Sequence, residues 1–197
     1  ESGRDNCPDW DIGMNNIVVP ENLESYTRRD TTHIDSEQRP TQEQYDRFIT
    51  IVKFGRECGW DQQQIHANGP FLMADPGVQF IFLRASRDLL AMARHLGMDM
   101  AIDEIEAWVA RVERGSDWLW NDAVDGYCAR DIRTGTFSDA ITNASALCFY
   151  AGVGTPEQNQ LMEAHCRRIL DASSYGMPSW DPEHPPFESQ KYWRGPV

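Results

Sequence analysis

The sequence contains no apolar run of the roughly 18 residues that a membrane-spanning helix needs. It is also short of cations, because 18 Lys and Arg side chains stand against 31 Asp and Glu side chains and leave a formal net charge of −13. An acidic surface of this kind repels phosphate backbones and anionic lipids. We therefore expect neither a nucleic acid nor a membrane among the partners of this protein.

The cysteines and histidines lack the spacing of a disulfide framework or a metal site. The five cysteines are odd in number, far apart and without a Cys-x-x-Cys pair: Cys7, Cys58, Cys128, Cys148 and Cys166. Buried free thiols are therefore the expected state. The five histidines show no His-x-x-x-His spacing. We expect no metal ion and no cofactor.

The chain also lacks a starting Met and a signal peptide. Because it begins at Glu1, we expect its natural N-terminus to be missing. The compartment then stays undetermined, with the cytoplasm favoured. Its 197 residues fit a single domain, and nothing in the sequence indicates an oligomeric state.

In place of sheet patterns, the sequence has a series of amphipathic helices. Thr41 and Gln44 form a capping pair at the start of the first helix. Asp75 followed by Pro76 opens a second helix that runs to Gly97. Its apolar side chains recur at 3-4 spacing and are expected to face the core: Phe82, Ala85, Leu89, Met92 and Leu96.

Three further helices follow along the chain. Asp99 is expected to cap a helix with an apolar stripe at Ile102, Ile105, Val109 and Val112. A brief helix is expected over residues 141–152, and Thr-Pro-Glu-Gln at residues 155–158 opens a fifth. Residues 126–135 alternate weakly and predict a short β-hairpin. Without a parallel-sheet pattern, this order of elements predicts an all-α helical array.

The first loop carries three carboxylates and a Trp within the eight residues from Arg4 to Asp11. Such a loop can hold the acid of a hydrolase, but Asp-Asn-x-Pro is also ordinary turn chemistry, because Asx side chains cap their own backbone. We expect Asp9 and Asp11 to be loop caps or solvent-facing charges. Asp5 is then one of three candidate acids, and the sequence leaves open whether Arg4 pairs with it.

The last loop places two adjacent aromatic residues, Tyr192 and Trp193, beside cations and a Gly-Pro pair. On a loop, such rings can form the wall of a sugar site. They can equally pack into the core, as large apolar side chains often do. The residues alone do not decide between these interpretations.

Taken together, the two loops resemble signature loops of glycoside hydrolase family 63. The motifs are Glu-Ser-Gly-Arg-Asp-Asn-x-Pro-x-Trp-Asp at residues 1–11 and Tyr-Trp-Arg-Gly-Pro-Val at residues 192–197. Between them, Arg-Pro-Thr at 39–41, Asp-Pro at 75–76 and Met-Pro-Ser at 177–179 follow in the order of the bacterial branch that hydrolyses mannosylglycerate or glucosylglycerate. The resemblance covers nearly the whole chain. It implies an all-α fold that forms about half of an (α/α)₆ barrel of the six-hairpin glycosidase type.

By the same resemblance, residues 1–197 are one partial catalytic domain that is truncated at both ends. A Trp normally precedes the position of Glu1, and another normally follows that of Val197. The general base of the family is a Glu that would lie beyond Val197, and Glu188 stands in the wrong order to replace it. We therefore expect this chain to be inactive alone and to expose apolar helix faces.

The resemblance implies an inverting α-glycosidase that hydrolyses a small sugar substrate, a glucoside or mannoside, with Asp5 as the general acid. A second carboxylate activates water from about 6.5–9.5 Å away. Asp5 must carry a proton before the attack, which burial or a neighbouring carboxylate would favour. Cys7 stands where this loop commonly has Ser, and inverting chemistry needs no covalent nucleophile.

The substrate-binding residues implied by the resemblance come from both halves of the chain. Arg39 and Tyr45 are expected near the leaving group, where Arg39 would hold a glycerate carboxylate through two hydrogen bonds. Tyr192 is expected to contact the sugar through its hydroxyl and Trp193 through its apolar face. Gly195 would permit a close backbone approach.

Three alternatives stay open. The same fold could act on oligosaccharides, as an α-glucosidase or a trehalase-like hydrolase. It could instead be a non-catalytic carbohydrate-binding helical module, or a structural scaffold in which Tyr192 and Trp193 lie in the core, remote from Asp5. Convergence of Asp5, Arg39 and Tyr45 with the Tyr192–Trp193 pair at one end of the array would favour the glycosidase.

Overall fold

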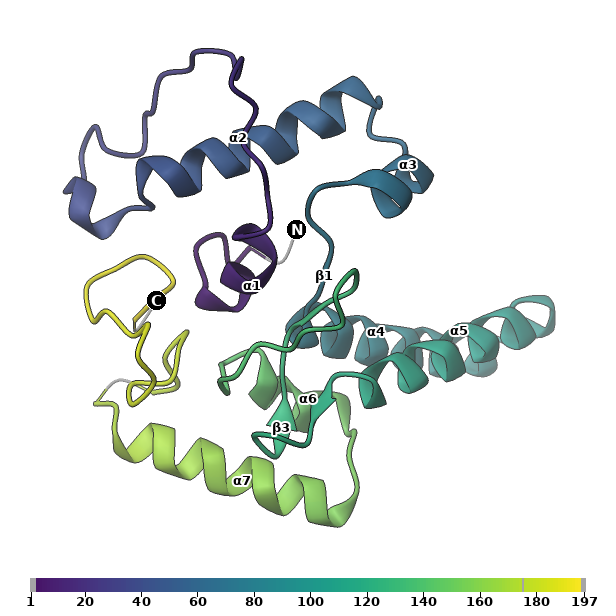
Figure 1. The fold of residues 1–197 in the computed structure, drawn as a ribbon. Helices are drawn as coiled ribbons and strands as arrows, with labels where there is room; N and C mark the ends of the chain where they lie inside the picture. The colour runs from purple at the N-terminus through teal and green to yellow at the C-terminus, as the bar shows by residue number, and fades with distance from the viewer. Residues whose placement is uncertain (1–2, 175, 196–197) are drawn as a thin grey trace.

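The computed structural model describes residues 3–174 and 176–195, so the outermost residues of both signature loops lie outside the described part. It confirms the all-α class. Figure 1 shows helices joined by long loops and a few very short strands. The helices are α1 (Asp11–Met14), α2 (Gln42–Glu57), α3 (Gln62–Asn68), α4 (Pro76–His95), α5 (Asp99–Asp117), α6 (Cys148–Ala151) and α7 (Pro156–Asp171). Three 3₁₀ turns, η1 (Pro8–Trp10), η2 (Ser36–Gln38) and η3 (Ser145–Leu147), complete the helical part.

The starts of α2, α4 and α7 agree with the capping patterns of the sequence. Thr41 caps α2 and Thr155 caps α7, each in a full capping box with the Gln three residues later. Asp75 caps α4 by accepting the Gly77 N–H at 2.8 Å. Asp99 was wrongly expected to cap α5, because the N-cap position falls on Met98, which makes no side-chain cap.

Two parts of the helical prediction need correction. Helix α3, which is capped by Asp61, was not predicted because its sequence has no apolar periodicity. The helix expected over residues 141–152 is shorter, since η3 and α6 together begin only at Ser145 and end before Gly152. That glycine has φ +65°, a left-handed conformation that stops the helix.

The strands also pair differently from the hairpin expected over residues 126–135. Strand β3 (Gly126–Tyr127) pairs antiparallel with β2 (Trp120–Asn121), which precedes it in the sequence. Strand β4 (Arg130–Asp131) pairs with the distant β1 (Met73–Ala74), and only an isolated bridge joins Arg130 to Phe137. Segments of two residues contain too few side chains for alternation to reveal which partner they will choose.

The main core lies between α4, α5, α6 and α7. Helices α4 and α5 run side by side, while α7 crosses the lower edge of the molecule (Figure 1). Three of the stripe residues expected on α5 are buried, at Ile105, Val109 and Val112. They share this core with Phe80 and Leu83 of α4. The middle of the chain therefore folds around the α4–α5 pair.

Helix α4 buries a different face from the one predicted. Its buried apolar residues include Phe80, Leu83 and Leu90, whereas most of the expected core stripe is exposed: Phe82 54%, Leu89 41%, Met92 55% and Leu96 69%. Both faces satisfy the 3-4 spacing, so periodicity could not choose between them. The exposed stripe fits the expectation that apolar helix faces remain uncovered in this chain.

A second apolar cluster joins the two ends of the chain. Cys7, Trp10 and Met14 from the first loop and α1 pack with Trp180, and Trp193 packs against the cluster from the C-terminal loop. In Figure 1 the C-terminal loop accordingly lies beside α1. The two motif loops are thus held together by burial of apolar surface.

The two faces of α4 give a matched stability test. Phe80→Ala is expected to lower the free energy of unfolding by about 3–5 kcal/mol, because it removes a fully buried ring that packs edge-on against Tyr127 at 5.1 Å. Phe82→Ala, two residues along, removes a ring that is 54% exposed and should cost less than about 1 kcal/mol. Chemical denaturation of both variants measures the difference. Equal losses would contradict the assignment of the buried face.

Among the described residues, no helix has both the length and the apolar character required to cross a membrane.

Candidate active site

The first loop presents Asp5 at the surface and buries its neighbours. The backbone turns twice, with the Cys7 N–H donating to the Arg4 carbonyl and the Trp10 N–H to the Cys7 carbonyl, both at 3.1 Å. The Trp10 indole N–H also donates to the Arg4 carbonyl, at 2.5 Å. Between Arg4 and Trp10, Asp5 is the only exposed residue. Of the three carboxylates in residues 4–11, Asp5 is therefore the most exposed to solvent.

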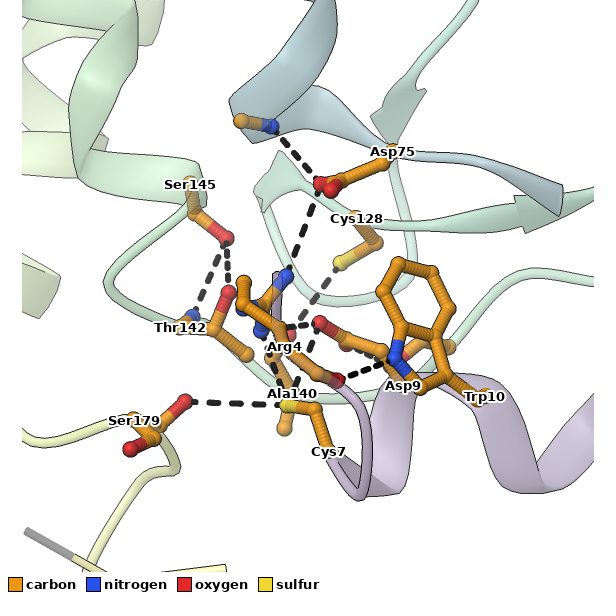
Figure 2. A network of polar contacts seen from close by, with 12 residues as sticks. Arg4, Cys7, Asp9, Trp10, Asp75, Cys128, Ala140, Thr142, Ser145 and Ser179 are labelled. Atoms are coloured by element: carbon orange, nitrogen blue, oxygen red, sulfur yellow. Dashed lines mark hydrogen bonds and ion pairs between the residues drawn. The ribbon is translucent and has the colours of Figure 1, made fainter. Parts of the chain in front are cut away.

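Arg4 is buried and points into the polar network of Figure 2. Its guanidinium donates to Asp9 at 2.5 Å, to the Cys7 sulfur at 2.8 Å and to Asp75 at 3.5 Å. Burial alone would lower the pKa of Arg4, but the nearby carboxylates, Asp9 foremost, raise it above its ordinary value. The cation next to Asp5 in sequence is thus engaged by other acids.

Asp9 is neither a loop cap nor a solvent-facing charge, so that expectation was wrong. Its side chain is 1% exposed, and Ser138 donates a hydrogen bond to its second oxygen at 2.9 Å. Asp11 is no free charge either, since Arg194 donates to both its oxygens at 2.9 and 2.6 Å. These pairs fasten the first loop to the rest of the fold.

The thiol of Cys7 is part of the same network. It is fully buried, and burial is the main cause that raises its pKa far above the ordinary value for cysteine. A neutral thiol here accepts from Arg4 and lies 3.6 Å from Asp9. This environment suits a structural side chain and gives no thiolate for chemistry. Cys128 and Cys148 are buried too, and burial is again the main cause that raises their pKa values.

Tyr192 brings the C-terminal loop to Asp5. Its hydroxyl lies 3.5 Å from the Asp5 carboxylate, a long but direct donor contact. Its backbone N–H donates to the Gln38 carbonyl at 3.0 Å, and the Asn6 amide donates to its carbonyl at 3.1 Å. The first and last loops therefore meet here, although Asp5 and Tyr192 are 187 positions apart in the sequence.

Arg39 lies over the ring of Tyr192. Its guanidinium carbon is 4.4 Å from the centre of the Tyr192 ring, the range of a cation–π contact. Its Nε donates to Asp30 at 3.3 Å. A second arginine, Arg28, also pairs with Asp30 and lies over the ring of Tyr45 at 4.3 Å. Four of the predicted site residues, Asp5, Tyr192, Arg39 and Tyr45, are thus connected by a continuous chain of contacts.

The other two predicted residues are placed less directly. Trp193 is half-buried in a left-handed backbone conformation with φ +58°, and its ring packs against the second apolar cluster. The close approach at Gly195 is to its own loop, because a Cβ there would lie 2.5 Å from the Glu188 carbonyl. Glycine at position 195 is therefore needed for the shape of the loop itself.

The residues that sequence reasoning missed are Arg28 and Asp30. They lie in the long irregular segment between α1 and α2, where no motif marked them. The charged run Arg28-Arg29-Asp30 is visible in the sequence, but only the fold brings Asp30 to Arg39, nine positions away.

An open hollow of about 240 Å³, solvent included, lies beside Asp5. Trp10 and Met14 from the first loop and α1, and Gln44 and Phe48 from α2, contribute to its lining. Within the described residues, no group of three or more His, Cys, Asp and Glu side chains is arranged to hold a metal ion. The chemical groups at the site are carboxylate, phenol, guanidinium and aromatic ring.

In the comparison with known proteins, one family model matches the whole sequence. The family model described as the mannosylglycerate hydrolase MGH1-like glycoside hydrolase domain matches residues 1–197. The mannosylglycerate hydrolase of Thermus thermophilus is 39% identical over 199 residues, and mannosylglycerate hydrolase MGH1 of Selaginella moellendorffii is 35% identical over 197. Each alignment covers 100% of this chain but only 47% and 40% of the relative, so the chain spans less than half the length of these relatives.

A solved structure agrees with these sequence relatives. The family 63 mannosylglycerate hydrolase from a second strain of Thermus thermophilus, crystallised with Tris and D-glycerate, superposes with a TM-score of 0.91 at 37% identity. The superposition covers 99% of this chain and 46% of the other. The helical array therefore has the fold of part of the helical barrel of that enzyme.

Proposed function

This chain belongs to the mannosylglycerate hydrolase MGH1-like family of glycoside hydrolases, and we propose that it supplies the acid half of an inverting α-glycosidase acting on mannosylglycerate or glucosylglycerate. The observation that carries the proposal is the meeting of Asp5 with Tyr192 and, through Tyr192, with Arg39. Three residues implied by the family resemblance, distant in sequence, are neighbours at the place where Asp5 is exposed. A scaffold with its Tyr-Trp pair remote from Asp5 would lack this meeting.

Asp5 is the proposed general acid. It donates its proton to the glycosidic oxygen as the bond to the leaving group breaks. Arg4, the neighbour of Asp5 in sequence, is paired with Asp9 and Asp75. A second carboxylate, on the far side of the sugar ring, accepts a proton from the attacking water.

Arg39 and Tyr45 form the proposed leaving-group side. The guanidinium of Arg39 suits a carboxylate, which it can bind through two parallel hydrogen bonds. The solved Thermus thermophilus enzyme was crystallised with D-glycerate, an acid of this kind. A glycerate leaving group held by Arg39 would direct its glycosidic oxygen towards Asp5.

Tyr192, Trp193 and Gly195 form the proposed sugar side. Tyr192 offers its hydroxyl, and the uncovered part of the half-buried Trp193 ring offers an apolar face to the sugar. The two rings are 6.0 Å apart at an angle of 67°, so they make a corner. Gly195 contributes by letting the loop fold back on Glu188.

The stereochemistry of the product tests the proposed reaction. The protein to use is a hybrid enzyme in which residues 1–197 replace the matching 47% of the Thermus thermophilus mannosylglycerate hydrolase. Because inversion places water opposite the leaving group, an α-linked substrate should first release the β-sugar, before mutarotation. Proton NMR during the first minutes distinguishes the anomers. Initial release of the α-sugar would rule out the inverting mechanism.

The leaving-group assignment predicts a selective loss in Arg39→Ala. In the hybrid enzyme, KM for mannosylglycerate should rise about 10-fold or more, because a charge-assisted hydrogen-bonded pair is lost. KM for methyl α-mannoside, whose leaving group has no carboxylate, should change less than about 2-fold. Steady-state kinetics on both substrates measures this. Equal effects on the two substrates would favour the alternative that the enzyme acts on neutral oligosaccharides.

A further inference from the structure

Asp30 is a nearly buried carboxylate held between two arginines. Its side chain is 7% exposed. Arg28 donates to both of its oxygens, through Nε at 3.1 Å and through a terminal nitrogen at 2.7 Å. Arg39 donates to it through Nε at 3.3 Å. All three residues come from the long irregular segment between α1 and α2. Their contacts help to hold this segment in place.

The two arginines are used differently. Arg28 is committed, because the same terminal nitrogen also donates to the Pro40 carbonyl at 2.8 Å and its plane covers the Tyr45 ring. Arg39 is held only at Nε and by the Tyr192 ring. Within residues 3–174 and 176–195, no hydrogen bond or ion pair occupies the two terminal nitrogens of Arg39. These are a pair of donors that can bind an oxyanion side by side.

The charges of the cluster favour an anionic ligand. The hydrogen bond from Arg28 is the main cause that lowers the pKa of Asp30, so the carboxylate is ionised at neutral pH. One carboxylate between two guanidiniums leaves a net charge of about +1 at this place. The whole chain, by contrast, carries −13. Without Arg28, Asp30 would neutralise Arg39 and no net positive charge would remain.

The position of the cluster connects it to the proposed acid. Arg39 lies over Tyr192, and the Tyr192 hydroxyl contacts Asp5 at 3.5 Å. An anion bound at the terminal nitrogens of Arg39 therefore lies one aromatic ring away from the carboxylate that would protonate the glycosidic oxygen. A leaving group that is a hydroxy acid has to be held at this place, beside the proton donor.

We propose that Asp30 is a positioning residue for leaving-group recognition: it holds Arg39 through Nε, with Arg28 as the balancing cation, and so leaves the terminal nitrogens of Arg39 for the carboxylate of the leaving group. This rests on the proposed function, and it adds two residues to it. Asp30 acts through Arg39 and does not touch the substrate. The chemical class that the site selects is a glycoside whose leaving group is a small hydroxy acid.

The test is the affinity of the 197-residue chain for D-glycerate and for its neutral amide, glyceramide, followed by NMR titration. Asp30→Asn should weaken D-glycerate binding about 10-fold, because the anchor of Arg39 loses its charge. Glyceramide binding should stay within about 2-fold. Asp30→Glu, which restores the carboxylate, should recover a large part of the loss. Asp88→Asn, which removes the carboxylate of another Arg–Asp pair on the exposed side of α4, is the matched control and should change neither ligand.

The outcomes separate this inference from the function on which it rests. If Arg39→Ala abolishes selective D-glycerate binding but Asp30→Asn leaves it intact, the role of Asp30 is refuted and the leaving-group site stands. If Arg39→Ala has no effect, or the unchanged chain binds no D-glycerate, both are refuted. Equal weakening of D-glycerate and glyceramide by Asp30→Asn would show a merely structural role.

A second variant covers the case in which Asp30→Asn does not fold, as judged by circular dichroism. Arg28→Lys keeps the balancing charge but loses the planar, two-point hold on Asp30. D-glycerate affinity should then fall about 3-fold with glyceramide unchanged. An unaltered D-glycerate affinity in a folded Arg28→Lys chain would overturn the proposal.

Discussion

Asp5→Asn in the hybrid enzyme is expected to lower kcat/KM on mannosylglycerate about 10³-fold. A general acid contributes roughly 10²–10⁴ to the rate when the leaving group is a poor one, and an amide cannot donate a comparable proton. The fold should be unaffected, because Asp5 is exposed and its contact to Tyr192 is long, 3.5 Å. Steady-state kinetics with purified protein measures the loss.

Asp103→Asn is the control for this variant. Asp103 is an exposed carboxylate on α5, so its removal takes away the same charge without touching the loop. Its kcat/KM should stay within about 2-fold of the unchanged hybrid. If Asp5→Asn kept more than a tenth of the activity, the acid would have to be sought elsewhere.

The 197-residue chain alone is expected to show no glycosidase turnover. An inverting reaction needs two carboxyl groups on opposite faces of the sugar, and the family resemblance puts the base after the Tyr192–Trp193 pair. Glu188 precedes that pair and is paired with Lys191 at 3.0 Å. Sugar release from mannosylglycerate over several days, compared with the Asp5→Asn chain, measures any activity. Hydrolysis above that background would contradict the proposed division of the catalytic groups.

Local rules predicted the starts of α2, α4 and α7. The capping boxes at Thr41 and Thr155 and the Asp75-Pro76 start of α4 depend on residues three positions apart or fewer, so sequence spacing contains the whole signal. Which face of α4 is buried depends instead on α5, and both faces carry apolar residues. The burial of Phe80 in place of Phe82 therefore required the fold.

The site shows the same division between local and distant information. The family motifs pointed to Asp5, Arg39 and Tyr192, and the structure brings these three together, while their roles stay proposals. The burial of Asp9 was missed because a short acidic loop ordinarily faces water, and only the packing of Arg4 and Ser138 around it makes a buried carboxylate tolerable. Asp30 was missed because no short motif contains it.

The most direct test of Asp5 as general acid is the dependence of the Asp5→Asn loss on the leaving group. α-Mannosyl fluoride releases a weakly basic anion that needs no proton donor, whereas mannosylglycerate releases an alkoxide that does. In the hybrid enzyme, kcat/KM for the fluoride should fall less than about 10-fold while that for mannosylglycerate falls about 10³-fold. Equal losses on the two substrates would contradict proton donation by Asp5.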